Sequence, residues 1–182
     1  MNEILEKVKQ YADEAHGSQM RKYTHQRYIV HPIEVMEICS EYTNDLCILA
    51  AALLHDVLED TPVTRADLEA FLRTIMNNSD AKRTTNLTVE LTDIYTKEAY
   101  PQYNRRVRKD KEHVRGAATS PAAQTIKYAD IISNSIDITA HDKDFGPKFL
   151  KEVRSQLKTM NKGNAALYAR AVATVDECLK KI

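Results

Sequence analysis

The sequence predicts an all-α protein, a helical bundle built around one buried central helix. Glycine (4) and proline (5) are scarce among the 182 residues and tryptophan is absent, a composition that favours helices. Nine consecutive apolar residues, Leu46–Leu54, are apolar on every side of a helix, so we expect other helices to cover them. No segment has a convincing two-residue apolar period, and no sheet is expected. We expect residues 1–182 to form a single domain.

Each expected helix is marked by capping residues, by helix breakers or by an apolar stripe. Residues favoured at helix starts are Asn2, His31-Pro32, Asn44 or Asp45, Thr64 with Asp67 as a capping box, and Ser120-Pro121. Breaks are expected at Gly17, Pro62, Tyr100-Pro101, Gly146-Pro147 and Gly163. In the C-terminal half this places helices over 104–118, 148–160 and 165–181, with another from Ser120-Pro121 through the isoleucines up to Ile136.

The middle of the chain is less regular. The polar run 77–85 is expected to be a loop. The Thr, Val and Ile of 87–95 suit a strand, but an isolated strand would have no partner, so we predict a helix there.

Charge and cysteine usage exclude several classes of protein. Lys+Arg and Asp+Glu number 26 each, so no global field draws the chain to a nucleic-acid polymer or an anionic membrane. Any phosphate binding must come from a local cluster of charges. The cysteines, Cys39, Cys47 and Cys178, form no C-x-x-C pair and are expected to be reduced core thiols of a cytoplasmic protein. No signal peptide and no apolar run of about 18 residues is present, so neither secretion nor membrane spanning is expected.

Metal-binding groups gather at the end of the central helix. His55-Asp56 follows the apolar run directly, and Glu59-Asp60 comes one turn later. At a continuous helical pitch His55 would lie over Glu59, and Asp56 over Asp60. Unpaired charges at the end of a buried helix are costly, and a bound cation resolves that cost. His with Asp suits a divalent transition metal. The alternative is a helix end whose polar residues face solvent before Pro62.

Two further stretches can join the same site. His31 stands at the start of a helix, and Lys127, Asp130 and Asn134 share one face of another whose opposite face carries isoleucines. Such a polar face is often merely solvated. Asp130 lies in the middle of a helix with almost entirely apolar neighbours, however, which favours a carboxylate with a partner.

The pattern H…HD…D in an all-α chain resembles the HD-domain metal-dependent phosphohydrolases. More narrowly, His55-Asp56-Val57-Leu58-Glu59-Asp60 matches the HDxxED signature of RelA/SpoT-type hydrolase domains and of their single-domain relatives, the small alarmone hydrolases. Other stretches that agree are Gln19-Met20-Arg21-Lys22, Tyr28-Ile29-Val30-His31-Pro32, Asn104-Arg105, Ile126-Lys127-Tyr128-Ala129-Asp130 and Leu167-Tyr168. The resemblance covers nearly the whole chain and implies the HD-domain helical bundle.

The resemblance also implies roles for individual residues. The metal ligands fall on His31, His55, Asp56 and Asp130, which would hold one divalent ion, usually Mn2+ in the family. The catalytic pair falls on Glu59 and Asp60, where it could orient a water or move a proton. The substrate-binding positions are Arg21, Lys22, Arg105, Lys127 and Asn134.

The activity that the resemblance implies is removal of the 3′-pyrophosphate from (p)ppGpp or its adenine counterpart. The expected partner is therefore a nucleotide, with neither a nucleic-acid polymer nor a membrane. The alternative is an HD-domain phosphatase of another nucleotide, such as NADPH or a nucleoside phosphate. A non-catalytic nucleotide sensor is a third class, against which the intact Glu59-Asp60 pair argues.

Two regions leave the substrate contacts open. On the arginine-rich helix 104–118 the family pattern favours Arg105, whereas Arg106, Arg108 and Lys109 could either contact phosphate or be solvated. Relatives commonly carry Gly-Glu-Pro where this chain has His25-Gln26-Arg27. This departure leaves the metal chemistry untouched and bears on which base is bound. His16, His25, His113 and His141 are expected on the surface or in loops, and His16 could also assist the site from the end of the first helix.

Overall fold

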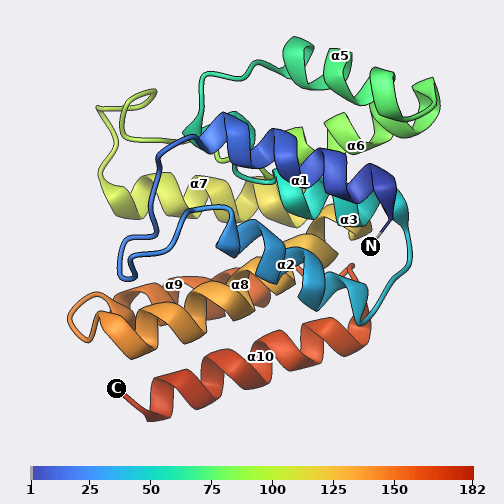
Figure 1. Ribbon diagram of the computed structural model, residues 1–182. Coiled ribbons are helices and arrows are strands. Elements are labelled where there is room, and N and C mark those ends of the chain that lie inside the picture. The colour runs from blue at the N-terminus through green and yellow to red at the C-terminus, as the bar shows by residue number, and fades with distance from the viewer. Residues whose placement is uncertain (1) are drawn as a thin grey trace. The chain divides into compact units, whose positions relative to one another are not determined.

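Helices and the loops between them make up the computed structural model, which describes residues 2–182 (Figure 1). In chain order they are α1 Glu3–His16, α2 Val30–Ser40, α3 Leu46–Leu54, α4 Val57–Asp60, α5 Arg65–Ile75, α6 Asn78–Leu91, α7 Arg105–Ala118, α8 Pro121–His141, α9 Gly146–Leu157 and α10 Ala165–Lys180. Within residues 2–182 the only strand-like pairing is an isolated antiparallel bridge between Met20 and Arg27. The predicted all-α class is confirmed.

The chain divides into two compact units. The N-terminal unit extends to Thr92 and the C-terminal unit is Asp93–Ile182. A single domain over 1–182 stays a prediction. Over the part of the chain that the structure describes, no helix has both the length and the apolar character needed to cross a membrane.

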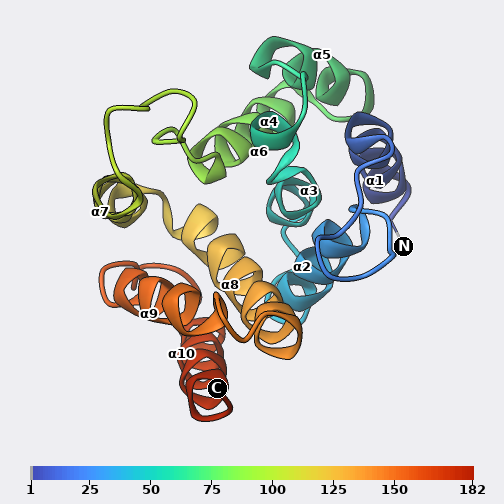
Figure 2. The same ribbon diagram turned by 90° about the vertical axis from the view of Figure 1, so that its left-hand side faces the viewer.

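The N-terminal unit is organised around α3, as predicted. Helices α1, α2 and α6 pack against α3, and α5 packs on α6 (Figure 2). Every residue of α3 after Leu46 is buried. Asp45, one of the two caps considered, accepts hydrogen bonds from the amides of Cys47 and Ile48. The apolar run therefore forms a fixed core helix that ends immediately before His55.

The central helix does not continue through His55-Asp56. It ends at Leu54, and these two residues form a turn before α4. The Asp56 backbone, at φ −99° and ψ −6°, leaves the ideal helical conformation. The single continuous helix expected through His55-Asp56 is therefore wrong, although the Asp60 amide still donates to the Asp56 carbonyl at 2.9 Å, so Asp56 keeps its expected relation to Asp60.

The loop predicted over 77–85 is also wrong. Asn77 caps α6, and residues 78–85 form the first turns of this helix. The same helix continues to Leu91, so the helix predicted over 87–95 is present only as far as that residue. The polar appearance of the segment hides a buried helical face, because its threonine hydroxyls bond back to the helix. Thr85 donates to the Ala81 carbonyl at 2.9 Å and Thr88 to the Thr84 carbonyl at 3.1 Å.

Most predicted boundaries agree with the structure to within a few residues. The caps at Asn2 and Ser120 and the Thr64–Asp67 capping box form as predicted, and Gly17 ends α1 with φ 57°. Two starts differ. Helix α2 begins one residue before His31, and Gly146-Pro147 opens α9 where a break was expected. Burial of the three cysteines is confirmed.

The C-terminal unit is built on α8, its longest helix. Helices α9 and α10 both pack on α8, and α7 packs on α9 (Figure 1). Tyr128 of α8 is fully buried, and its hydroxyl donates to the Met160 carbonyl at 2.8 Å. The loop before α10 passes so close that a Cβ on Gly163 would lie 2.6 Å from the Tyr128 ring. Glycine is needed there, and α8 is held firmly in its unit.

Candidate functional site

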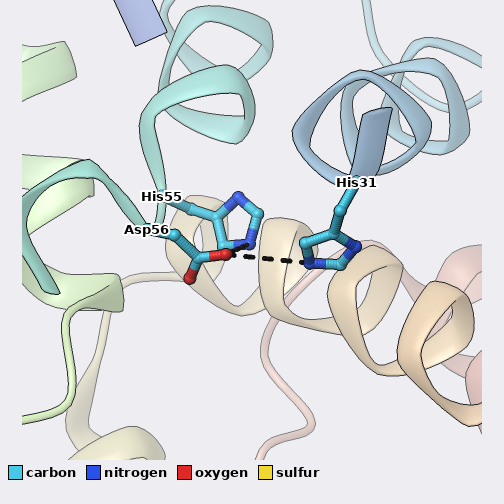
Figure 3. A group of neighbouring side chains, drawn as sticks. All are labelled: His31, His55 and Asp56. Atoms are coloured by element: carbon cyan, nitrogen blue, oxygen red, sulfur yellow. Dashed lines mark ion pairs between the residues drawn. The ribbon is translucent and has the colours of Figure 1, made fainter. Parts of the chain in front are cut away.

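Three side chains of the N-terminal unit converge in a small cluster (Figure 3). One ligand atom from each of His31, His55 and Asp56 lies within 4.8 Å of the others. Asp56 Oδ2 is 2.9 Å from His55 Nε2 and 3.8 Å from His31 Nε2. The two imidazole rings are 5.1 Å apart, with their planes at 70°. Two imidazoles and a carboxylate in this arrangement can bind a divalent metal ion.

The fold fixes both imidazoles. His31 lies in the first turn of α2 and His55 follows α3, and the two residues are 4% and 3% exposed. His55 Nδ1 lies 2.8 Å from the Ala52 carbonyl, which can only accept a hydrogen bond, so Nδ1 carries the proton. The other ring nitrogen, Nε2, faces the cluster, which is the usual arrangement of a metal-binding histidine.

The predicted catalytic pair lies immediately beyond the cluster. Glu59 and Asp60 are on α4, and both are exposed. Asp60 Oδ2 accepts a hydrogen bond from Gln19 Nε2 at 3.2 Å, and Gln19 Oε1 is 2.9 Å from His16 Nδ1. His16 is 7% exposed, so it is a buried residue next to the site and not a surface residue.

The fourth predicted ligand, Asp130, lies on α8 in the C-terminal unit. It is 6% exposed, and both of its oxygens are engaged. Asn134 Nδ2 donates to Oδ1 at 2.5 Å, and Lys127 Nζ lies 2.8 Å from Oδ2. Asp130 is thus a carboxylate with partners, as predicted, and its role as a metal ligand stays a prediction.

A cavity of about 120 Å³ opens in the C-terminal unit and is lined from α7, α8 and α9. Arg105, Lys127 and Asn134, which are the substrate-binding residues predicted for this half of the chain, all line it. The same wall includes Lys109. By contrast, the Arg106 side chain is 90% exposed. On the arginine-rich helix, Arg105 and Lys109 therefore face the cavity and are placed to contact a phosphate, whereas Arg106 faces solvent.

The cations of the cavity wall are held by carboxylates. Arg105 makes a two-pronged contact with Glu152, at 3.0 and 2.7 Å. Lys109 Nζ lies 2.9 Å from Asp93 Oδ2. Burial raises the pKa of Asp93, but Lys127, Lys109 and Arg115 outweigh burial and hold that pKa below its usual range.

Sequence reasoning missed Asp93. It stands in the segment predicted as a helix, between α6 and α7, and only the tertiary structure shows three basic side chains around it. His113, which was expected on the surface or in a loop, instead lies half-buried on α7 and lines the same cavity. Burial lowers the pKa of His113, so this imidazole is neutral at pH 7.

The remaining predicted contacts lie after α1. Arg21 is 8% exposed and its Nη1 donates to Glu34 Oε2 at 2.9 Å. The Lys22 ammonium is exposed and lies over the Tyr23 ring, 4.6 Å from its centroid. Arg27 Nη2 pairs with Asp13 at 2.8 Å, which anchors the divergent loop to α1.

Comparisons with known proteins agree with this geometry. The family model described as HD domain matches residues 9–82. A guanosine-3′,5′-bis(diphosphate) 3′-pyrophosphohydrolase of Vibrio cholerae is 49% identical over 59 residues, 32% of this chain and 8% of that protein. A probable enzyme of the same name from Mycoplasma pneumoniae is 30% identical over 148 residues, 77% of this chain and 19% of that protein. A solved structure described as a metazoan orthologue of SpoT that hydrolyses ppGpp matches with a TM-score of 0.80 and 25% identity, covering 100% of this chain and 96% of that one.

The HD-domain match covers the N-terminal part of the chain, which carries the His-His-Asp cluster. The chain resembles the RelA/SpoT-type hydrolase domains in sequence and in fold, which confirms the resemblance seen in the sequence. The chain spans less than a fifth of the length of these curated relatives.

Proposed function

We propose that the chain is a metal-dependent pyrophosphohydrolase that removes the 3′-pyrophosphate from (p)ppGpp-type alarmones, in the guanine or the adenine form. One observation carries the proposal. A cluster of the buried His31 and His55 with the half-buried Asp56 is followed at once by the exposed carboxylates of Glu59 and Asp60. Relatives described as ppGpp hydrolases support the choice of substrate.

The residues present fit a single divalent ion, for which we propose Mn2+. His31, His55 and Asp56 would hold it, with Asp130 as the fourth ligand. Imidazole nitrogen and carboxylate oxygen together suit a transition metal of intermediate softness, and the His55–Ala52 hydrogen bond already fixes the required tautomer. A metal bound there supplies an activated water and stabilises negative charge on the phosphoryl group.

The chain's own residues would handle the proton and the substrate. Glu59 and Asp60 orient the attacking water and accept its proton. The bond between the 3′-oxygen of the ribose and phosphorus then breaks, the 3′-oxygen is protonated, and pyrophosphate leaves. Arg21 and Lys22 would contact the base and ribose, while the cavity of the C-terminal unit would bind phosphate through Arg105, Lys127 and Asn134.

The charge of the cavity supports metal dependence. Its lining carries three cations, Arg105, Lys109 and Lys127, against the four carboxylates of Asp93, Glu112, Asp130 and Glu152. Arg115 adds a fourth cation beside the lining, 2.7 Å from Glu112 and 3.9 Å from Asp93, so the charges balance and the cavity has no positive surplus to attract a polyanion. A divalent cation that binds with the nucleotide would supply that charge. We therefore expect nucleotide binding to require the metal.

The deciding experiment is incubation with a panel of nucleotides and Mn2+, with the products resolved by anion-exchange chromatography. Release of pyrophosphate from ppGpp or ppApp is expected. Release of orthophosphate from NADPH or a nucleoside phosphate would instead support the alternative phosphatase.

Elemental analysis tests the metal centre directly. His55→Ala and Asp56→Ala should lose the bound metal, because each removes a ligand of the cluster. The control is His141→Ala, since His141 is an exposed residue of α8 that contacts Asp137. Full stoichiometric metal in both cluster variants would overturn the proposed centre.

A further inference from the structure

The hydroxyl of Tyr28 reaches into the cluster from the segment that joins α1 to α2. Tyr28 Oη donates a hydrogen bond to Asp56 Oδ2 at 2.5 Å. This is the same carboxylate oxygen that lies 2.9 Å from His55 Nε2 and 3.8 Å from His31 Nε2. A carboxylate oxygen has two lone pairs, so it can accept the hydrogen bond from the tyrosine hydroxyl and still bind a metal ion.

The position of Tyr28 is set independently of Asp56. Its ring lies 4.5 Å from the buried His16 ring at the end of α1 and 6.0 Å, edge-on, from the His31 ring. Its amide donates to the Gln19 carbonyl at 2.9 Å, and its own carbonyl accepts from the His31 amide at 2.9 Å. The hydroxyl is therefore presented to Asp56 by an already ordered part of the unit.

A tyrosine suits this position chemically. Asp56 belongs to a turn and not to a helix, and its side chain is 20% exposed, so the turn alone does not fix the direction of its carboxylate. A neutral hydroxyl can orient that carboxylate without cancelling the charge that a cation needs. A lysine or arginine in the same place would compete with the metal.

We propose that Tyr28 is a positioning residue of the metal centre, which holds the Asp56 carboxylate in the direction needed to bind the ion together with His31 and His55. This inference rests on the proposed function, in which Asp56 is a metal ligand. Hydrogen-bond partners of this kind commonly change metal affinity by about 10- to 100-fold when they are removed.

The test is Tyr28→Phe, which keeps the ring contacts and removes only the hydroxyl. Mn2+ titration followed by electron paramagnetic resonance should show an affinity about 10-fold weaker or more, with an altered spectrum of the bound ion. The helical circular dichroism signal should stay at the wild-type level. The matched control is Tyr11→Phe, since Tyr11 is a tyrosine of the same unit whose ring stacks on Phe71 at 3.9 Å. The control should leave both the affinity and the spectrum unchanged.

The outcomes separate this inference from the proposed function. If the wild-type protein binds Mn2+ and Tyr28→Phe binds it equally tightly, the positioning role is refuted and the metal centre stands. If the wild-type protein binds no Mn2+, the proposed centre falls, and the inference with it. Loss of helical signal in Tyr28→Phe would also overturn the inference, because the hydroxyl would then be needed for the fold.

Discussion

Asp93 offers a sharp test of how the cavity in the C-terminal unit is held together. Its carboxylate lines the cavity, with Oδ2 2.9 Å from Lys109 Nζ and Oδ1 3.9 Å from Arg115 Nη2. Asp93→Asn keeps the shape of the side chain and removes its charge. The substitution should therefore leave neighbouring cations without their counter-charge and destabilise the unit.

The size of the effect follows from these contacts. A hydrogen bond to a charged group contributes about 1.5–3 kcal/mol to stability. The Lys109 and Arg115 side chains are 35% and 23% exposed, so solvent screening keeps the value near the lower end. We expect a loss of about 1.5–2 kcal/mol in the free energy of unfolding at pH 7. For a chain of this length, that corresponds to a fall of about 3–8 °C in Tm.

The pH dependence has a definite sign. The pKa of Asp93 is held below its ordinary value of 3.8 in the folded protein, so the unfolded chain takes up the proton first as the pH falls. The charge of Asp93 therefore contributes fully above pH 3.8, and its contribution disappears as the pH falls through the lowered folded pKa. Asparagine has no such titration.

Urea unfolding followed by circular dichroism at pH 7 and pH 3 measures both effects. The stability gap between wild type and Asp93→Asn should be present at pH 7 and smaller at pH 3. Asp110→Asn is the control, because the Asp110 side chain is 68% exposed and 4.0 Å from Arg106, and it should cost less than about 0.5 kcal/mol. Equal stability at pH 7, or a gap that does not shrink at pH 3, would refute the reasoning.

Three further predictions concern activity. Glu59→Gln and Asp60→Asn should each lower kcat by roughly 10²-fold while Mn2+ content stays at the wild-type level, and fully active variants would contradict their catalytic role. Lys109→Gln should lower kcat/KM by about 10- to 100-fold, the scale of one lost charge-assisted contact, whereas Arg106→Gln should have no effect, since Arg106 is 90% exposed. Equal effects of these two substitutions would place the phosphates elsewhere. Replacing residues 25–27 by Gly-Glu-Pro should change the ratio of kcat/KM for ppGpp and ppApp, because a guanidinium stacks on either purine and discrimination needs hydrogen bonds from the loop. An unchanged ratio would show that the loop does not choose the base.

Features that depend on local chemistry were predictable from the sequence. The capping residues Asn2, Asp45 and Ser120 act within one turn of their own position, and the apolar run Leu46–Leu54 can only be a buried helix. The cluster of His31, His55 and Asp56 was predicted as well, because its residues stand in a recognisable pattern.

Features that depend on packing were not predictable in the same way. The threonines of α6 look like a loop until their hydroxyls are seen bonding to carbonyls four residues back. Asp93 carries no local signal, because its basic partners Lys109, Arg115 and Lys127 are separated from it by 16 to 34 residues (109 − 93 = 16; 127 − 93 = 34).

The turn at His55-Asp56 shows how the cluster is built. On a regular helix, neighbouring residues point about 100° apart, so an adjacent pair does not face each other directly. The backbone stays close to helical at this point, since the Asp60 amide still donates to the Asp56 carbonyl at 2.9 Å, but α3 ends at Leu54 and Asp56 has φ −99° and ψ −6°. In this turn His55 Nε2 lies 2.9 Å from Asp56 Oδ2. The buried apolar helix fixes the point from which the pair starts, and the turn after it holds the two side chains together at the place where we propose that one metal ion binds.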